Sequence, residues 1–284
     1  MSVSDRKREL RERVWSLLEE RGAARFPRPT RGRIPNFQGA REAARRILDT
    51  DEFRRAQVVK VNPDFPQLKV RIGVLEAGKI LIMPSPRLRS GFFFLDPARI
   101  PERLHGRAAT IRGSFQHASK IGLEDLPAVD LIVCGSVAVT EGGVRVGKGG
   151  GYSELEYAIL RELGLVDGET PIVTTVHDLQ IVEDVPVEEH DFSVDLIATP
   201  TRLIRAEGPR RRPRGIIWEK LPERRLEEMP ILKRLKRWPR ASWDAPSRAT
   251  RAGEFDRGLT DLPRRCAPRR LARGSLPPRC PSRA

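Results

Sequence analysis

A short stretch rich in glycine carries the residues best suited to chemistry. It follows an apolar run that ends at Gly135 and precedes a segment with helical spacing. Glycines let consecutive backbone N–H groups converge on one anion, and a helix N-terminus adds partial positive charge. Cations beside the glycines supply partners for phosphate oxygens. The stretch therefore predicts a polyphosphate-binding loop, with a flexible surface turn as the alternative. Its members are Arg145, Gly147, Lys148, Gly149, Gly150 and Gly151.

Two common phosphate motifs do not fit this loop. Gly142, Gly147 and Lys148 have the spacing of a Walker A loop, but Gly149 stands where a Ser or Thr must bind magnesium. A dinucleotide fingerprint fails because its third glycine position is Tyr152. The residues alone leave the kind of phosphate ligand open.

The elements that position the loop follow from the apolar pattern. Runs rich in Val, Ile and Leu predict strands at residues 58–61, 80–83, 91–95, 131–135, 172–176 and 195–199. Helical spacing predicts helices at residues 4–21, 40–48, 67–77 and 153–163. Continuous apolar strands separated by helices indicate a mostly parallel sheet covered on both faces. Residues 1–205 are therefore expected to form one α/β domain, with Cys134 as a buried thiol and Phe92, Phe93 and Phe94 in packing roles.

Charge divides the chain unevenly. Residues 1–205 hold 31 basic and 29 acidic side chains, whereas residues 206–284 hold 22 basic and 9 acidic ones. A basic extension at 206–237, with a helix at about 221–235, is expected to dock on the domain. Residues 238–284 contain seven prolines, eleven arginines and no lysine, which predicts a disordered tail.

The arginine-rich tail has three interpretations. Disordered arginine segments can bind RNA or DNA weakly by releasing counterions from phosphates. The chain as a whole, however, has 44 Arg and 9 Lys, so the tail can instead reflect an arginine-biased composition. An extension without a selected role is the third alternative.

Several protein classes are excluded by what the sequence lacks. It has no run of 18 apolar residues, and its first 30 residues do not have the pattern of a signal peptide. Its three cysteines are far apart and have no histidine at metal-ligand spacing. We therefore expect a cytoplasmic protein without a membrane span, a disulfide framework or a zinc site.

Three blocks in order resemble the 5-formyltetrahydrofolate cyclo-ligases, also called methenyltetrahydrofolate synthetases. Residues 145–152 are similar to the family's R-L-G-R-G-x-G-Y-Y-D motif, and residues 7–11 match its opening K-x-x-L-R helix. Residues 177–195 resemble its Q-x-x-x-x-x-P-x-x-x-H-D-x-x-x-D stretch. The resemblance covers about residues 5–205. Residues 32–37 and 148–160 look closer still to a divergent branch, whose animal members join the domain to an RNA-binding module.

The resemblance implies a three-layer α/β/α fold of the NagB/RpiA/CoA transferase-like type. It also implies ATP- and Mg²⁺-dependent closure of 5-formyltetrahydrofolate to 5,10-methenyltetrahydrofolate, in which ATP phosphorylates the formyl oxygen. The protein then has mainly to position the γ-phosphoryl group and neutralise its charge. A reduced folate or related pterin is the expected substrate.

Site roles carry over position by position. The resemblance implies that Arg145, Lys148 and the backbone of residues 147–151 hold the phosphates, that Lys7 and Arg11 reach the nucleotide, and that Tyr152 lines the folate side. The motif's second tyrosine is Ser153 here, and its aspartate is Glu154, which can still coordinate magnesium. His177 follows a predicted strand at its carboxyl end, where α/β sheets commonly bind ligands.

Each of these assignments has a simpler alternative. Glu154 lies in the first turn of a predicted helix, where acidic residues are favoured without a metal. Lys7 and Arg11 could belong to a solvated helix face, and His177 could be an ordinary loop histidine. For the whole protein, the alternatives to a cyclo-ligase are a non-catalytic nucleotide- or RNA-binding relative and an enzyme that acts on another phosphoester or pterin.

Overall fold

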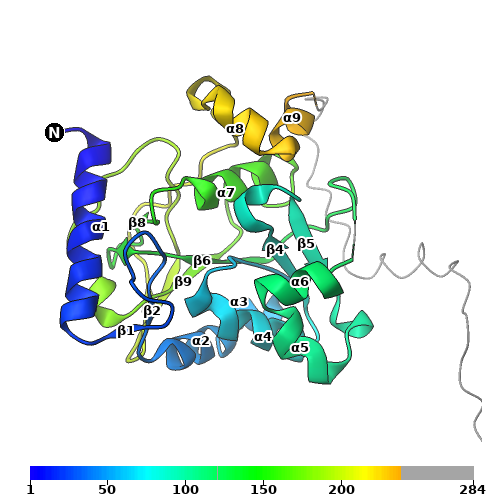
Figure 1. The fold of residues 1–284 in the computed structure, drawn as a ribbon, viewed down its shortest axis with the longest axis horizontal. Helices are drawn as coiled ribbons and strands as arrows, with labels where there is room; N and C mark the ends of the chain where they lie inside the picture. Colours follow the sequence, from blue (N-terminus) through cyan, green and yellow to red (C-terminus); the bar gives the residue numbers. More distant parts are fainter. Residues whose placement is uncertain (120, 238–284) are drawn as a thin grey trace, which may run out of the picture. The chain divides into compact units, whose positions relative to one another are not determined.

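A seven-stranded sheet forms the centre of the computed structural model, which describes residues 1–119 and 121–237 (Figure 1). The strand order is β11-β10-β9-β6-β3-β4-β5. The five inner strands are parallel, and the edge strands β5 and β11 are antiparallel to their neighbours. The strands are β3 (Val58–Val61), β4 (Ile80–Pro84), β5 (Phe92–Leu95), β6 (Leu131–Gly135), β9 (Ile172–Thr175), β10 (Leu196–Ala198) and β11 (Leu203–Arg205).

The inner strands are buried on both faces, as their continuous apolar sequences predict. Helices α2 to α6 lie on one side of the sheet, and α7 lies on the other with α8 (Glu223–Glu228) and α9 (Pro230–Lys236) above it (Figure 1). The predicted three-layer α/β/α fold with a mostly parallel sheet is confirmed. The helices next to the two faces of the sheet are α2 (Ala40–Leu48), α3 (Asp51–Arg55), α4 (Leu68–Glu76), α5 (His105–Ala108), α6 (Ile111–His117) and α7 (Tyr152–Glu162).

The main core lies between the sheet and helices α2 and α4. Ile47 and Val74 are buried there against Val59, Leu131 and other strand residues. Cys134 and Phe92–Leu95 are also buried, which confirms the packing roles predicted for the cysteine and the three phenylalanines. Burial raises the pKa of the Cys134 thiol.

Helix α1 (Val3–Glu20) begins at a capping box between Ser2 and Asp5. Leu10, Val14 and Leu18 face a second core that includes residues of the small hairpin of β7 (Ala138–Val139) and β8 (Arg145–Val146). A two-stranded ribbon of β1 (Ala24–Arg25) and β2 (Asn36–Phe37) follows the helix. This packing holds one face of α1 beside the end of β8, where the glycine loop starts.

The extension contains two helices where the sequence predicts one. They are α8 (Glu223–Glu228) and α9 (Pro230–Lys236). The break falls at Pro230 because proline lacks a backbone N–H and disfavours a helical residue before it. Met229 accordingly has φ −127° and ψ 93°. Met229, Leu232 and Leu235 are buried, so α9 packs through its apolar side chains.

The predicted disordered tail at 238–284 lies outside the described residues. Its weak binding of nucleic acid therefore stays a prediction, as does the cytoplasmic location. Within residues 1–119 and 121–237, every helix is too short or too polar to cross a membrane.

Candidate active site

A cavity of about 770 Å³ lies at the carboxyl ends of β3 and β4. The loop that follows β8, the start of α7 and the first turns of α1 complete its wall. Ligands of open α/β sheets commonly bind at the carboxyl ends of the strands. Of the residues predicted for the site, the cavity is lined by Lys7, Arg11, Gly147, Lys148, Gly149, Gly150, Gly151, Tyr152 and Glu154.

The glycine loop needs glycine at two positions for its backbone alone. Gly149 has φ +93° and Gly151, which precedes α7, has φ +66°. Both values lie in the left-handed region that other residues rarely adopt. Arg11 approaches this loop closely, because its Nε donates a hydrogen bond of 2.7 Å to the carbonyl oxygen of Gly147. A Cβ on Gly149 would stand 3.3 Å from the Arg11 guanidinium carbon.

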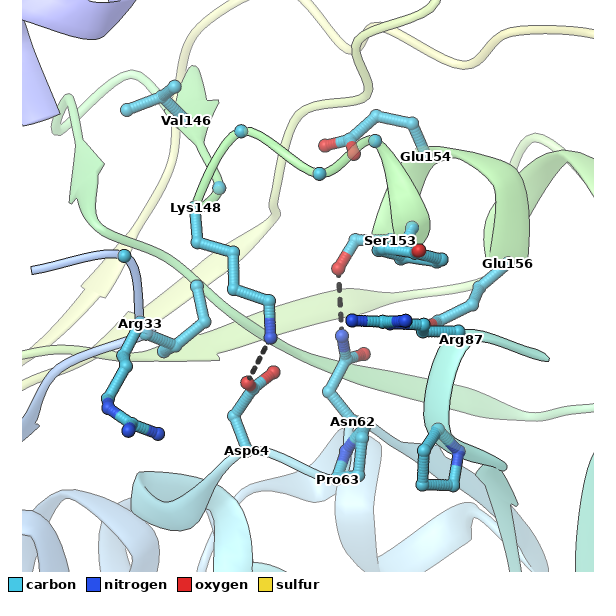
Figure 2. Close-up of a pocket in the computed structure, with 18 of the residues that line it drawn as sticks. Arg33, Asn62, Pro63, Asp64, Arg87, Val146, Lys148, Ser153, Glu154 and Glu156 are labelled. Atoms are coloured by element: carbon cyan, nitrogen blue, oxygen red, sulfur yellow. Dashed lines mark hydrogen bonds and ion pairs between the residues drawn. The ribbon is translucent and has the colours of Figure 1, made fainter. Parts of the chain in front are cut away.

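Lys148 crosses the cavity toward the end of β3 (Figure 2). Its Nζ lies 2.9 Å from Oδ1 of Asp64, and its side chain is 38% exposed. A half-exposed ion pair of this kind is weak, so the ammonium group can exchange Asp64 for a stronger anion.

Arg145 is placed differently from Lys148, because its side chain is only 1% exposed and does not line the cavity. Its guanidinium donates to the Gly135 carbonyl oxygen, to Ser136 Oγ and to Glu154 Oε1, at 3.1, 3.2 and 2.8 Å. The Phe192 ring covers it at 4.7 Å. This buried position does not support the direct phosphate contact that the resemblance implies for Arg145.

Glu154 reaches the cavity from the first turn of α7 while it holds Arg145. Burial acts to raise the pKa of Glu154, but the charge of Arg145, hydrogen bonds from Arg145 and from the backbone, and the nearby His190 together outweigh it, so the pKa is lowered and the group is ionised. Among residues 1–119 and 121–237, no group of three His, Cys, Asp or Glu side chains could hold a metal. Glu154 is thus a single carboxylate, which suits Mg²⁺ only when phosphates and waters supply the other ligands.

The Arg145–Glu154 pair predicts a pH dependence. Because the folded-state pKa of Glu154 lies below its ordinary 4.5, its contribution to stability is full above that pH and is lost as the pH falls through the folded-state value. The difference in unfolding free energy between the wild type and Glu154→Gln should therefore shrink below about pH 4.5. Urea titrations of both proteins across this range measure it, and a difference that is constant with pH would contradict the assignment.

Lys7 is buried, and its Nζ lies 2.5 Å from Asp191 and 2.8 Å from Glu188. Both acids belong to the third block of the sequence resemblance, so the fold brings the first and third blocks together. The hydrogen bond from Lys7 lowers the pKa of Glu188. Lys7 thus lines the cavity while Glu188 and Asp191 balance its charge. Its contact with a nucleotide stays a prediction.

His177 does not line the cavity. It caps the short helix Asp178–Gln180, where its Nδ1 accepts a hydrogen bond of 3.1 Å from the Leu179 N–H. Its ring meets Phe37 edge to face at 6.0 Å. Burial lowers its pKa, which favours the neutral ring that this cap requires. Its predicted substrate contact has no support from this position.

Several cavity residues were not singled out by the sequence. Asn62 and Asp64 follow β3, while Arg33 and Arg87 belong to neighbouring loops. Arg87 has φ +54°, an uncommon value outside glycine that recurs at functional sites. One sequence signal points to these residues: Lys60 is a charged residue inside the otherwise apolar strand β3, which Asn62 and Asp64 follow.

Arg225 of helix α8 ties the basic extension to the glycine loop. Its Nη2 donates a hydrogen bond of 2.5 Å to the Gly150 carbonyl oxygen. Its guanidinium also covers the Tyr152 ring at 4.7 Å. The extension therefore contacts the cavity wall at two points, Gly150 in the loop and Tyr152 at the start of α7.

Removing this contact should loosen the loop. We expect Arg225→Ala to speed amide hydrogen exchange of residues 147–151 about tenfold, because one charge-assisted hydrogen bond and one cation–π contact are lost. Arg224→Ala is a matched control, since Arg224 is exposed and, among the residues that the structure describes, pairs only with Glu228. Hydrogen–deuterium exchange of the wild type and both variants measures the effect. Equal behaviour of the two variants would show that α8 does not position the loop.

Fold and site together define an α/β protein whose cavity lies at the carboxyl ends of parallel strands and is lined by a glycine-rich loop. The sequence profile of the 5-formyltetrahydrofolate cyclo-ligase family matches residues 3–200. The chain belongs to this family, which confirms the resemblance seen in the sequence.

Methenyltetrahydrofolate synthase domain-containing proteins of animals are similar to most of this chain. The Homo sapiens protein is 45% identical over 240 residues, which are 83% of this chain and 62% of the relative. The Danio rerio protein is 41% identical over 241 residues, or 83% and 63%. The chain thus spans a little over three fifths of the length of these relatives.

Bacterial proteins are also similar to parts of this chain. The 5-formyltetrahydrofolate cyclo-ligase of Escherichia coli (strain K12) is 31% identical over 90 residues, which are 31% of this chain and 47% of that protein. The NMR structure of Aquifex aeolicus 5,10-methenyltetrahydrofolate synthetase matches with a TM-score of 0.47 at 20% identity, covering 72% of this chain and 94% of that one.

Proposed function

We propose that this protein is an ATP- and Mg²⁺-dependent ligase that converts 5-formyltetrahydrofolate to 5,10-methenyltetrahydrofolate. The observation that carries the proposal is the meeting of the glycine loop, Arg11 and Lys148 in the cavity that Tyr152 also lines. Membership of the cyclo-ligase family supports the choice of reaction.

The chemistry explains why a phosphate loop serves a ring closure. A formamide carbonyl is a poor electrophile, so its oxygen first attacks the γ-phosphorus of ATP and ADP leaves. The neighbouring amine then attacks the activated carbon, and loss of inorganic phosphate leaves the methenyl bridge. The protein's task is to position the γ-phosphoryl group and to offset its charge.

The nearly balanced charges of the cavity suit a nucleotide whose phosphate charge is partly neutralised by Mg²⁺. Counted over the described part of the chain, its lining holds six Lys or Arg side chains and five carboxylates. Within residues 1–119 and 121–237, the guanidinium groups of Arg33 and Arg87 form no hydrogen bond or ion pair, and both side chains are exposed. These groups, with Lys148, can meet phosphate oxygens without first breaking a buried pair.

Glu154 is the carboxylate that fits Mg²⁺ in this proposal. The ion, when bound with the nucleotide, would neutralise charge on the phosphates. Arg145 acts through Glu154: it fixes the carboxylate from behind, so we assign Arg145 a positioning role rather than direct contact. Tyr152 is assigned to the pterin side of the cavity.

The coupling of the two substrates tests the proposal. ADP release by the full chain is measured with ATP and Mg²⁺, with and without 5-formyltetrahydrofolate. We expect release only when the formyl-pterin is present, because the attacking oxygen belongs to it. ADP release that is independent of the formyl-pterin would contradict the proposal. ATP binding without turnover would favour the non-catalytic nucleotide-binding alternative.

A further inference from the structure

Beneath the cavity, four polar side chains form a connected chain that we call the floor network: Lys60, Asn62, Ser153 and Glu156. Lys60 Nζ lies 2.5 Å from Glu156 Oε2 and donates a hydrogen bond of 2.7 Å to Asn62 Oδ1. Asn62 Nδ2 in turn donates a hydrogen bond of 2.8 Å to Ser153 Oγ (Figure 2). Lys60, Asn62 and Glu156 are each less than 5% exposed.

Stability alone is a weak reason for this network. A buried ion pair contributes little net stability, and apolar residues of similar volume often serve as well or better. Lys60 occupies the centre of a strand that is otherwise Val-Val-x-Val. Three of the four members line the cavity, and Lys60 lies directly behind them. Their position indicates a role toward a ligand.

The network fixes the direction of one proton. A lysine ammonium group only donates, so the side-chain oxygen of Asn62 must face Lys60. The Asn62 amide nitrogen must then face Ser153, which accepts that hydrogen bond. The Ser153 hydroxyl proton is left for a group in the cavity.

Glu156 offers a hydrogen-bond acceptor, in contrast to the donor offered by Ser153. Its Oε2 meets Lys60, whereas its Oε1 has no hydrogen-bond partner within residues 1–119 and 121–237. Ser153 and Glu156 are three residues apart on α7 and therefore lie on the same face of the helix. The floor thus offers one donor and one acceptor side by side, which is the complement of an adjacent C=O and N–H.

We propose that Ser153 and Glu156 read the lactam edge of the substrate's pterin ring, and that Lys60 and Asn62 set the direction of the Ser153 proton. The ring's carbonyl oxygen would accept from Ser153, and the adjacent ring N–H would donate to Glu156. The motif's second tyrosine is absent at Ser153, so hydrogen bonding replaces a stacking surface here. The choice of a pterin rests on the proposed function.

Two fluorescent probes test the inference without ATP or turnover. Pterin carries the lactam edge, a carbonyl group next to a ring N–H. In 2,4-diaminopteridine an amino group replaces the carbonyl oxygen, and the adjacent ring nitrogen carries no hydrogen. At pH 7 the wild type should bind pterin at least about tenfold more tightly, since each mismatched buried hydrogen bond weakens binding by about that factor. Fluorescence titration of the full chain gives the ratio of the two dissociation constants.

Variants separate recognition from packing. Asn62→Asp keeps the shape but cannot donate, so the Ser153 proton turns away from the cavity and the preference should fall about tenfold. Ser153→Ala should have the same effect, and Ser153→Thr should retain the preference. A purely structural network would change both affinities together and leave the ratio unaltered.

The outcomes are distinct from those of the ATP experiment. A wild type without preference, or a ratio that both Asn62→Asp and Ser153→Ala leave unchanged, would overturn the inference even if cyclisation occurs. A clear preference that both variants lose would support it even if ADP release failed to depend on the formyl-pterin.

Discussion

Replacing Arg145 with alanine is expected to lower the free energy of unfolding by about 3–5 kcal/mol, because the change leaves a partner charge without compensation. Arg145 is buried, and its guanidinium joins the end of β6 to Glu154 at the start of α7. The Gly135 carbonyl oxygen and Ser136 Oγ would lose their donor as well. The effect is one of stability and reaches activity through the position of Glu154.

Urea denaturation of the wild type and three variants measures this. Arg145→Lys keeps the charge but cannot make the forked contacts, so it should recover only part of the loss. The double variant Arg145→Met with Glu154→Gln should be less destabilised than Arg145→Ala, because no buried charge is left unpaired. A loss below about 1 kcal/mol for Arg145→Ala would be that of an exposed pair and would contradict the buried role.

Lys148→Met is expected to lower kcat/KM for ATP about 100-fold with little change in stability. The Lys148 ammonium group is half-exposed, and within residues 1–119 and 121–237 it pairs only with Asp64 at the cavity wall. Loss of one preorganised charge at a phosphoryl-transfer site typically has an effect of this size. Lys148→Arg should retain part of the activity because it keeps the charge.

Lys69→Met is the matched control for the loss of a lysine. Lys69 is exposed on α4 and does not line the cavity. It should have wild-type kinetics. Similar values of kcat/KM for Lys148→Met and the wild type would remove Lys148 from the proposed phosphate site.

The strands and main helices follow from local sequence. The apolar runs at β3 and β6 and the helical spacing of α2 predict these elements at their observed residues. The glycine loop is also evident, because left-handed backbone and anion binding both select glycine. These features depend on short stretches of chain, where pattern and propensity act directly.

The side-chain pairing of the site could not be predicted in the same way. Lys60 and Glu156 are 96 residues apart, and their contact depends on how α7 sits over β3. Arg145 belongs to a motif that suits a phosphate, but its side chain turns inward to Glu154 because β8 is buried on both sides. Only the three-dimensional arrangement separates the half-exposed cation Lys148 from the buried cation Arg145.

The most direct test of the proposed function is the absorbance of the methenyl product. The full chain is mixed with 5-formyltetrahydrofolate, Mg²⁺ and ATP, and the methenyl-pterin band is followed beside a Lys148→Met sample. The proposed site predicts growth of the band that requires ATP and is about 100-fold slower in the variant. No growth of the band with the folded wild type, or equal growth with both proteins, would contradict it.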